Sequence, residues 1–203
     1  MTEIVLASDL PRRAKRLAWA TVTWNITEAL VAVLAGAAAG SVALIGFGLD
    51  STVEVMSALV ILWQFRGVPD EREQSARRLI ALSFFALATY VAAQAIHDLA
   101  NRAAPDPSPI GITLAVASLI VMPALAVAKR RTGQAMHSNT VVADSNQTKL
   151  CAYLSAILLA GLVLNATVAW WWADPVAALG IALLALNEGR GAWRGEGSVA
   201  CCR

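Results

Sequence analysis

The sequence predicts an all-α membrane protein, a six-transmembrane-helix bundle with both termini cytoplasmic. Three observations support this class. Of the 203 residues, 58% are hydrophobic and only 15% are charged, whereas soluble domains average about 25% charged residues. Long apolar runs recur along the whole chain. Lysine and arginine residues are concentrated in alternate connections between these runs.

Six apolar runs are candidates for helices that cross a bilayer, which takes about 20 predominantly apolar residues in a helix. The last run is the shortest, and it reaches this length only by including the tryptophans at 170–172. The runs cover residues 17–39, 41–65, 79–99, 110–128, 141–167 and 175–186. We therefore expect a cytoplasmic segment over 1–16, a transmembrane domain over 17–187 and a short cytoplasmic tail over 188–203.

The connections between the runs carry the residues that end helices. Residues 66–78 are strongly polar, and residues 101–109 are rich in proline, which favours a turn. A basic stretch joins the fourth and fifth runs. Asp174 followed by Pro175 is typical of an N-cap and the first position of a helix, so this pair is expected to start the sixth helix.

The distribution of positive charge predicts the orientation. Cytoplasmic connections of membrane proteins carry an excess of lysine and arginine. With both termini inside, fourteen basic residues lie on the cytoplasmic side, Arg102 alone lies outside, and Lys149 falls within a run. The fourteen are Arg12, Arg13, Lys15, Arg16, Arg66, Arg72, Arg77, Arg78, Lys129, Arg130, Arg131, Arg190, Arg194 and Arg203.

Two acids, Asp50 and Glu54, lie near the middle of the second apolar run. Residues four apart share one face of a helix, about 6 Å apart along its axis. Ionisable groups inside a membrane span are costly to keep and usually mark a functional site. Two like charges on one buried face require a positive partner, and a divalent cation or exchangeable protons would provide it. The alternative is a polar contact between helices.

The fifth run carries a second polar stripe. Asp144, Gln147 and Cys151 are spaced i, i+3 and i+7, which places them along one side of a helix. Together with Asp50 and Glu54 they would form a metal site. A thiolate favours zinc or another borderline-soft metal, while carboxylates alone admit manganese or magnesium. The alternatives are a helix-end role for Asp144, an interhelical hydrogen bond for Gln147 and simple apolar packing of Cys151.

Several other polar residues have two possible interpretations each. Asn25 and Glu28 lie in the first run and form either a proton path or contact to the acids, or a structural hydrogen bond. Lys149 is expected to extend to the membrane surface or to pair with an acid such as Glu28. Cys201 and Cys202 are adjacent, which disfavours a bridge between them; they either capture thiophilic metal or are free thiols.

Three stretches of sequence match a known family. GSVALIGFGLDSTVEVMSALVI resembles the second transmembrane helix of the cation diffusion facilitator (cation efflux) family, in which His or Asp is followed four residues later by Asp. VVADSNQTKLCAYLS resembles its fifth helix, with Ala-Asp before a His-x-x-x-Asp pair, and WADPVAALGIALLAL resembles the start of its sixth. Asp50, Glu54, Gln147 and Cys151 fall on the ligand positions, and Asp144 falls on the preceding aspartate.

The resemblance implies a homodimeric transporter, and not an enzyme, that exports a divalent cation, most often Zn²⁺, by proton antiport. The ion would lie between the second and fifth helices, with no cofactor besides this cargo and no nucleic acid partner. We expect a multi-pass protein of the bacterial plasma membrane, from the short branch that lacks the C-terminal cytoplasmic domain.

The sequence also departs from the family pattern. Glu54 stands in place of the second Asp, and Gln147 and Cys151 in place of His and Asp. These changes leave the metal open. They also leave an alternative function, a non-transporting membrane metal-binding or interaction protein on the same scaffold.

Overall fold

The computed structural model describes residues 2–64, 70–137 and 139–194. Within these ranges the regular structure consists of six α-helices, one over each predicted apolar run. They are α1 (Thr2–Ala39), α2 (Val42–Gln64), α3 (Asp70–Asn101), α4 (Pro109–Ala135), α5 (Asn139–Val168) and α6 (Ala173–Arg194). For the residues that the structure describes, the prediction of an all-helical chain with six helices is confirmed.

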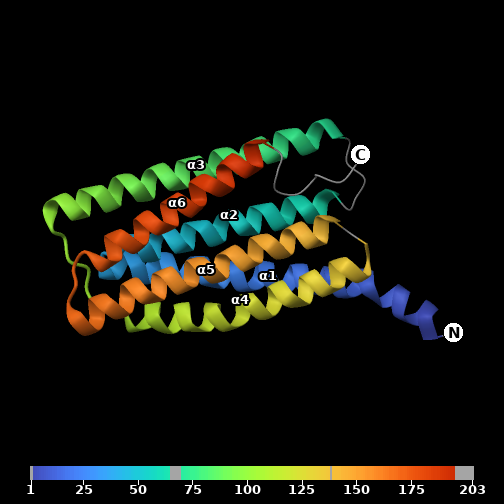
Figure 1. The fold of residues 1–203 in the computed structure, drawn as a ribbon, viewed down its shortest axis with the longest axis horizontal. Helices are drawn as coiled ribbons and strands as arrows, with labels where there is room; N and C mark the ends of the chain where they lie inside the picture. The colour runs from blue at the N-terminus through green and yellow to red at the C-terminus, as the bar shows by residue number, and fades with distance from the viewer. Residues whose placement is uncertain (1, 65–69, 138, 195–203) are drawn as a thin grey trace.

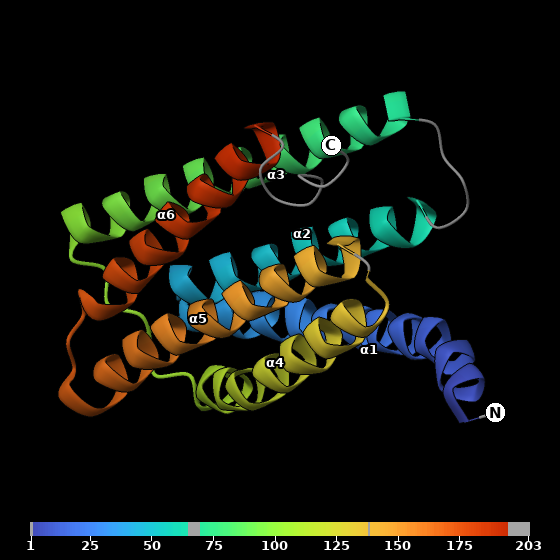
Figure 2. The ribbon, with the colours of Figure 1, turned by 45° about the vertical axis from the view of Figure 1, so that its right-hand side comes forward.

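The helices form an elongated bundle in which successive helices run in opposite directions (Figure 1). The most extensive contacts are between α1 and α2, between α4 and α5, and between α3 and α6. Helices α2 and α5 contact each other, and both contact α6. Figure 2 shows the pair α3 and α6 on one side of the layer formed by the other helices. Helix α6 runs toward the end of the bundle at which α1 begins (Figure 1).

Four helices, α1, α3, α4 and α6, extend well beyond the predicted apolar runs. Helix α1 begins at Thr2, so the segment expected before residue 17 is helical, and α6 continues to Arg194, into the expected tail. The difference arises because hydropathy marks where a chain enters lipid, whereas a helix continues until its backbone hydrogen bonding is interrupted. Cys201 and Cys202 lie outside the described residues.

Four helices contain a segment long and apolar enough to cross a membrane in the described part of the chain. These segments are Leu10–Ala39, Arg78–Asn101, Pro109–Ala135 and Asp144–Val168. Within the described residues, α2 and α6 contribute no further segment of this kind. Leucine and isoleucine side chains nevertheless project outward from the bundle, among them Leu34, Ile120 and Leu183. Four candidate spans and this apolar outer surface indicate an integral multi-pass membrane protein, while six crossings remain a prediction.

Glycine allows α2 to approach α1 closely beside Asp50. A Cβ atom on Gly48 would lie 2.9 Å from Val33 Cγ2 and 3.0 Å from Ala32 Cβ, which is too close for any larger residue without movement. Gly40 has a φ of +67° and forms the turn between α1 and α2, a backbone conformation that favours glycine. The two glycines therefore fix where α2 starts and how deeply its acids lie in the bundle.

Asp174 joins α6 to the beginning of α2. Its Oδ1 accepts a hydrogen bond from Ser41 Oγ, and its Oδ2 accepts one from the Ala43 backbone N–H at 3.3 Å. Ser41 Oγ also accepts a bond from the Leu44 N–H at 3.1 Å, which makes Ser41 the N-cap of α2. Asp174 was expected to start its own helix; it lies in the first turn of α6, and its carboxylate serves the neighbouring helix instead.

Replacing Asp174 with alanine is expected to lower the free energy of unfolding by about 1–2 kcal/mol, because the Ser41 hydroxyl and a helix N-terminal N–H lose their acceptor. Thermal unfolding in detergent measures this loss. The matched control is Asp106→Ala, since Asp106 is exposed in the connection between α3 and α4. Equal unfolding temperatures for the two variants would rule out the capping role.

Candidate metal centre

Both acids of α2 are directed into the bundle. Asp50 is 8% exposed and Glu54 is 4% exposed. They share one face because they are one helical turn apart, and α2 has α1, α3, α5 and α6 around it. The sequence therefore identified two carboxylates that are held in the protein interior rather than against lipid.

A single small cavity joins these acids to α5. Asp50 and Glu54 line it from α2, Gln147 and Cys151 line it from α5, and Glu188 lines it from α6. Its volume is about 20 Å³, enough for one water molecule or one metal ion. The remaining wall is apolar and consists of Phe84, Leu150, Leu154, Leu184 and Ala185. Four of the five predicted ligands thus meet at one place, and Glu188 is an additional acid that had been assigned to the tail.

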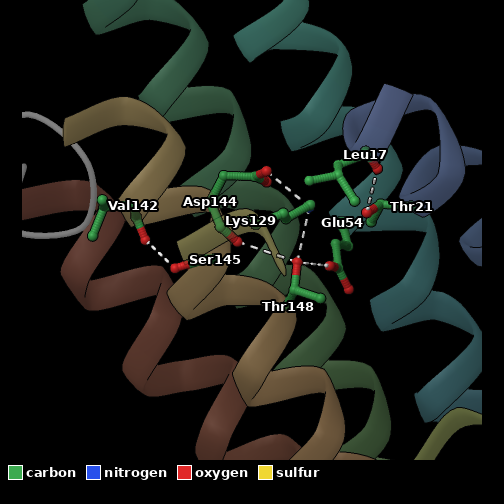
Figure 3. A network of polar contacts seen from close by, with 8 residues as sticks. All are labelled: Leu17, Thr21, Glu54, Lys129, Val142, Asp144, Ser145 and Thr148. Carbon is green, nitrogen blue, oxygen red and sulfur yellow. Dashed lines mark hydrogen bonds and ion pairs between the residues drawn. The ribbon is translucent and has the colours of Figure 1, made fainter. Parts of the chain in front are cut away.

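Asp144, the fifth predicted ligand, is not among the residues that line this cavity. Its Oδ2 forms an ion pair with Lys129 Nζ of α4 at 2.8 Å. Lys129 Nζ also donates to Thr148 Oγ1 at 2.9 Å, and Thr148 Oγ1 lies 3.2 Å from Glu54 Oε1 (Figure 3). Thr148 Oγ1 is also 3.2 Å from the Asp144 carbonyl oxygen, and its single proton serves one of these acceptors at a time. A short polar chain therefore connects a buried ammonium group to one acid of the cavity.

Lys129 was assigned to a cytoplasmic connection, and this assignment was wrong. The residue is 1% exposed, whereas the adjacent Arg130 and Arg131 are exposed. Helix α4 continues to Ala135, so Lys129 extends the buried stripe of that helix by one more turn. The stripe was visible in the sequence as the spacing of Gly111, Ala115, Ser118, Met122, Ala126 and Lys129.

Glu28 of α1 contacts both α2 and α5 in this region. It is fully buried; its Oε2 accepts from Ser51 Oγ at 2.9 Å and lies 3.8 Å from Cys151 Sγ. Trp24 Nε1 donates to Oε1 at 3.4 Å. Glu28 therefore contacts a predicted ligand directly. Cys151 thus both contacts Glu28 and lines the cavity.

Two further residues of this region were considered in the sequence. Lys149 does not pair with Glu28: it is exposed on α5, with Nζ 5.8 Å from the centre of the Tyr153 ring. Asn25 is fully buried, and its side-chain amide has no hydrogen-bond partner among the described residues. The face of α1 that contains Glu28 therefore also presents an unsatisfied polar group to the interior.

The centre of the bundle has more negative than positive groups. Among the described residues, Glu28, Asp50, Glu54 and Asp144 are buried acids of this region, and Lys129 is the buried base. Buried charges are stable only when paired, so three of the four acids require protons or an added cation. No group of three or more His, Cys, Asp or Glu side chains in the described residues is arranged to hold a metal ion. Coordination by the cavity would require its side chains to move toward the ion.

The helical bundle has membrane-length segments and a buried acidic centre. This combination is typical of multi-pass membrane proteins that bind or move cations inside the bilayer. The family model for the cation efflux transmembrane domain matches residues 18–194. The match covers most of the chain, and the chain belongs to the cation efflux family. This family is one of transporters rather than enzymes, and membership supports cation transport as the general function.

Two other proteins are similar to this chain in sequence, at 22% and 28% identity. The chain is 22% identical over 188 residues to transmembrane protein 163 of Xenopus laevis, a match that covers 90% of this chain and 67% of the relative. It is 28% identical over 161 residues to an uncharacterized transporter of Synechocystis sp., a match that covers 74% of this chain and 52% of the relative. The chain thus spans about half the length of the Synechocystis protein.

Proposed function

We propose that this protein exports a divalent metal cation, preferentially Zn²⁺, by proton antiport through the cavity between α2 and α5. One observation carries the proposal: carboxylates of Asp50 and Glu54 and the thiol of Cys151 line the same ion-sized cavity. Carboxylate oxygen and thiolate sulfur are both ligands of Zn²⁺ in proteins. Gln147 and Glu188 supply further oxygen atoms at the same place.

In this proposal Asp144 acts through its ion pair rather than on the cargo. The pair with Lys129 fixes a positive charge next to Thr148, and Thr148 lies beside Glu54. An ammonium group near the site repels a second cation and orients the hydroxyl toward the carboxylate. The sequence-based assignment of Asp144 as a direct ligand is therefore replaced here by a positioning role.

Exchange with protons follows from the chemistry of the ligands. A carboxylate or thiol binds a metal ion only after losing its proton, so protons and metal compete for the same groups. Loading from the cytoplasm would release protons from Asp50, Glu54 or Cys151. Protonation from the opposite side would then displace the ion. The arginine-rich end of the bundle faces the cytoplasm in this scheme, in agreement with the charge distribution.

The family suggests the setting in which this exchange would occur. A homodimer in the bacterial plasma membrane, with both termini cytoplasmic, is part of the same proposal. The second candidate function is a membrane protein that binds metal without transporting it. The absence of a ready three-ligand group in the described residues favours that candidate. Reconstitution separates the two, since a carrier moves Zn²⁺ across the membrane and a binder does not.

Replacing Cys151 with serine tests the metal preference. The variant keeps the size of the side chain and exchanges sulfur for oxygen. Transport of Zn²⁺ and Cd²⁺ is expected to fall about tenfold, which corresponds to about 1.4 kcal/mol, while transport of Mn²⁺ changes little. Proteoliposomes with and without a pH gradient provide the measurement.

The matched control for Cys151→Ser is Ser155→Ala, one turn further along α5. Ser155 is buried, and its hydroxyl contacts Ser118 Oγ and the Cys151 backbone carbonyl, but Ser155 does not line the cavity. A Cys151→Ser variant that slows all metals equally would indicate a packing role for the thiol. Zn²⁺ binding without flux in the wild type would instead support the non-transporting alternative.

A further inference from the structure

A second hollow lies between α3 and α6, near the end of α6. It has a volume of about 240 Å³ and is lined by Leu82 and Phe85 from α3 and by Arg190, Trp193 and Arg194 from α6. It shares no lining residue with the metal cavity. Its walls are thus two arginines on one side and two large apolar side chains on the other.

The two helices come close together directly beside this hollow. A Cβ atom on Gly189 would lie 2.8 Å from Phe85 Cε1, so this glycine permits the contact. The Phe85 and Trp193 rings have centroids 6.4 Å apart. The indole that forms part of the wall is therefore held in place by packing against α3.

Two guanidinium groups line the hollow, and a third lies near the Trp193 ring that forms part of its wall. Arg190 and Arg194 are one helical turn apart and so share a face of α6. The guanidinium of Arg78 lies 6.0 Å from the centre of the Trp193 ring. Within the described part of the chain, the ion pair that forms is Lys129 with Asp144, and none of these three arginines has a carboxylate partner there. Unpaired guanidinium groups readily bind phosphate oxygens, often by two parallel hydrogen bonds.

The hollow lies at the edge of the apolar layer of the bundle. Arg78 directly precedes the apolar run over 79–99, and Leu82 and Phe85 lie within that run. Leu82 and Trp193 are both exposed on the outer surface of the bundle. Tryptophan is typical of membrane–water interfaces, and arginine pockets at this level bind anionic head groups. Such a position would place the arginines in the head-group region and the apolar wall against the acyl chains.

We infer that this hollow binds the head group of an anionic phospholipid. The phosphate accepts hydrogen bonds from Arg190 and Arg194, and an acyl chain lies along Leu82 and Phe85. A free phosphate ion would use only the arginine wall, whereas a phospholipid uses both walls. The inference is independent of the proposed metal transport, because it rests on different residues.

Native mass spectrometry of the full chain in a neutral detergent tests this inference. Phosphatidylglycerol and phosphatidylcholine are titrated in parallel, and the fraction of protein that retains one lipid is measured. The wild type is expected to retain phosphatidylglycerol at least about tenfold more tightly than phosphatidylcholine. The double variant R190Q/R194Q is expected to lose this preference.

The matched control is R12Q/R13Q, which removes the same charge from exposed positions on α1. It should leave the preference intact. An equal loss in both double variants would show general electrostatic attraction and overturn the inference. Displacement of the lipid by millimolar inorganic phosphate would also overturn it, since the site would then recognise the anion alone.

Thermal unfolding of each variant without lipid verifies that all are folded. Trp193→Leu provides a second variant that should weaken lipid retention without any change of charge.

Discussion

Replacing Asp50 with asparagine, or Glu54 with glutamine, is expected to reduce the rate of Zn²⁺ transport by about ten- to hundredfold. Both changes keep the shape of the side chain and remove its charge. A charged hydrogen-bonding or ligand group in a buried site contributes roughly 1.5–3 kcal/mol, and 1.4 kcal/mol corresponds to a factor of ten. The measurement is the initial rate of Zn²⁺ movement into proteoliposomes, together with the dissociation constant from calorimetry.

The control for these two variants is Asp98→Asn. Asp98 is a half-buried acid near the end of α3, and it does not line the cavity. Its neutralisation should leave transport within about twofold of the wild type. Transport that persists in both Asp50→Asn and Glu54→Gln, or that falls equally in Asp98→Asn, would exclude the cavity as the ion site.

Replacing Lys129 with methionine is expected to lower the free energy of unfolding by about 3–5 kcal/mol. The change leaves the Asp144 carboxylate buried without its partner at 2.8 Å. It also removes the donor that contacts Thr148 Oγ1. Denaturant or thermal unfolding in detergent measures the effect.

The double variant Lys129→Met with Asp144→Asn separates the charge effect from packing. Because it removes both charges, it is expected to recover most of the lost stability. Arg130→Met is the matched single control, because Arg130 is exposed and next in sequence; its effect should be within about 0.5 kcal/mol. A double variant no more stable than Lys129→Met would contradict the role assigned to this pair.

The sequence predicted the helices well because a helix that crosses a membrane requires a long run of apolar residues. Their polar stripes were equally informative. Asp50 with Glu54 on α2, and Gln147 with Cys151 on α5, each form one polar face on an apolar helix, and such faces avoid lipid by meeting inside the bundle. In the structure, all four side chains line the same cavity.

The residues that sequence analysis missed lie just beyond the predicted ends of the runs. Lys129 directly follows the fourth run, and Glu188 lies two residues after the sixth. Hydropathy assigns such charged residues to the connections, although their helices continue and direct them inward. For Lys149 the sequence left two alternatives, extension to the membrane surface or an ion pair, and the pair with Glu28 is not formed. Spacing along α5 shows that it lies away from Gln147, but it does not show which helix, if any, covers that side.

Anomalous X-ray scattering from zinc, in crystals of the wild-type protein grown with Zn²⁺, tests the central claim most directly. The expected result is a zinc peak in the cavity between α2 and α5, about 2.0–2.3 Å from oxygen atoms of Asp50 and Glu54 and from Cys151 Sγ. A protein that transports Zn²⁺ but shows its zinc peak away from these three residues would contradict the claim.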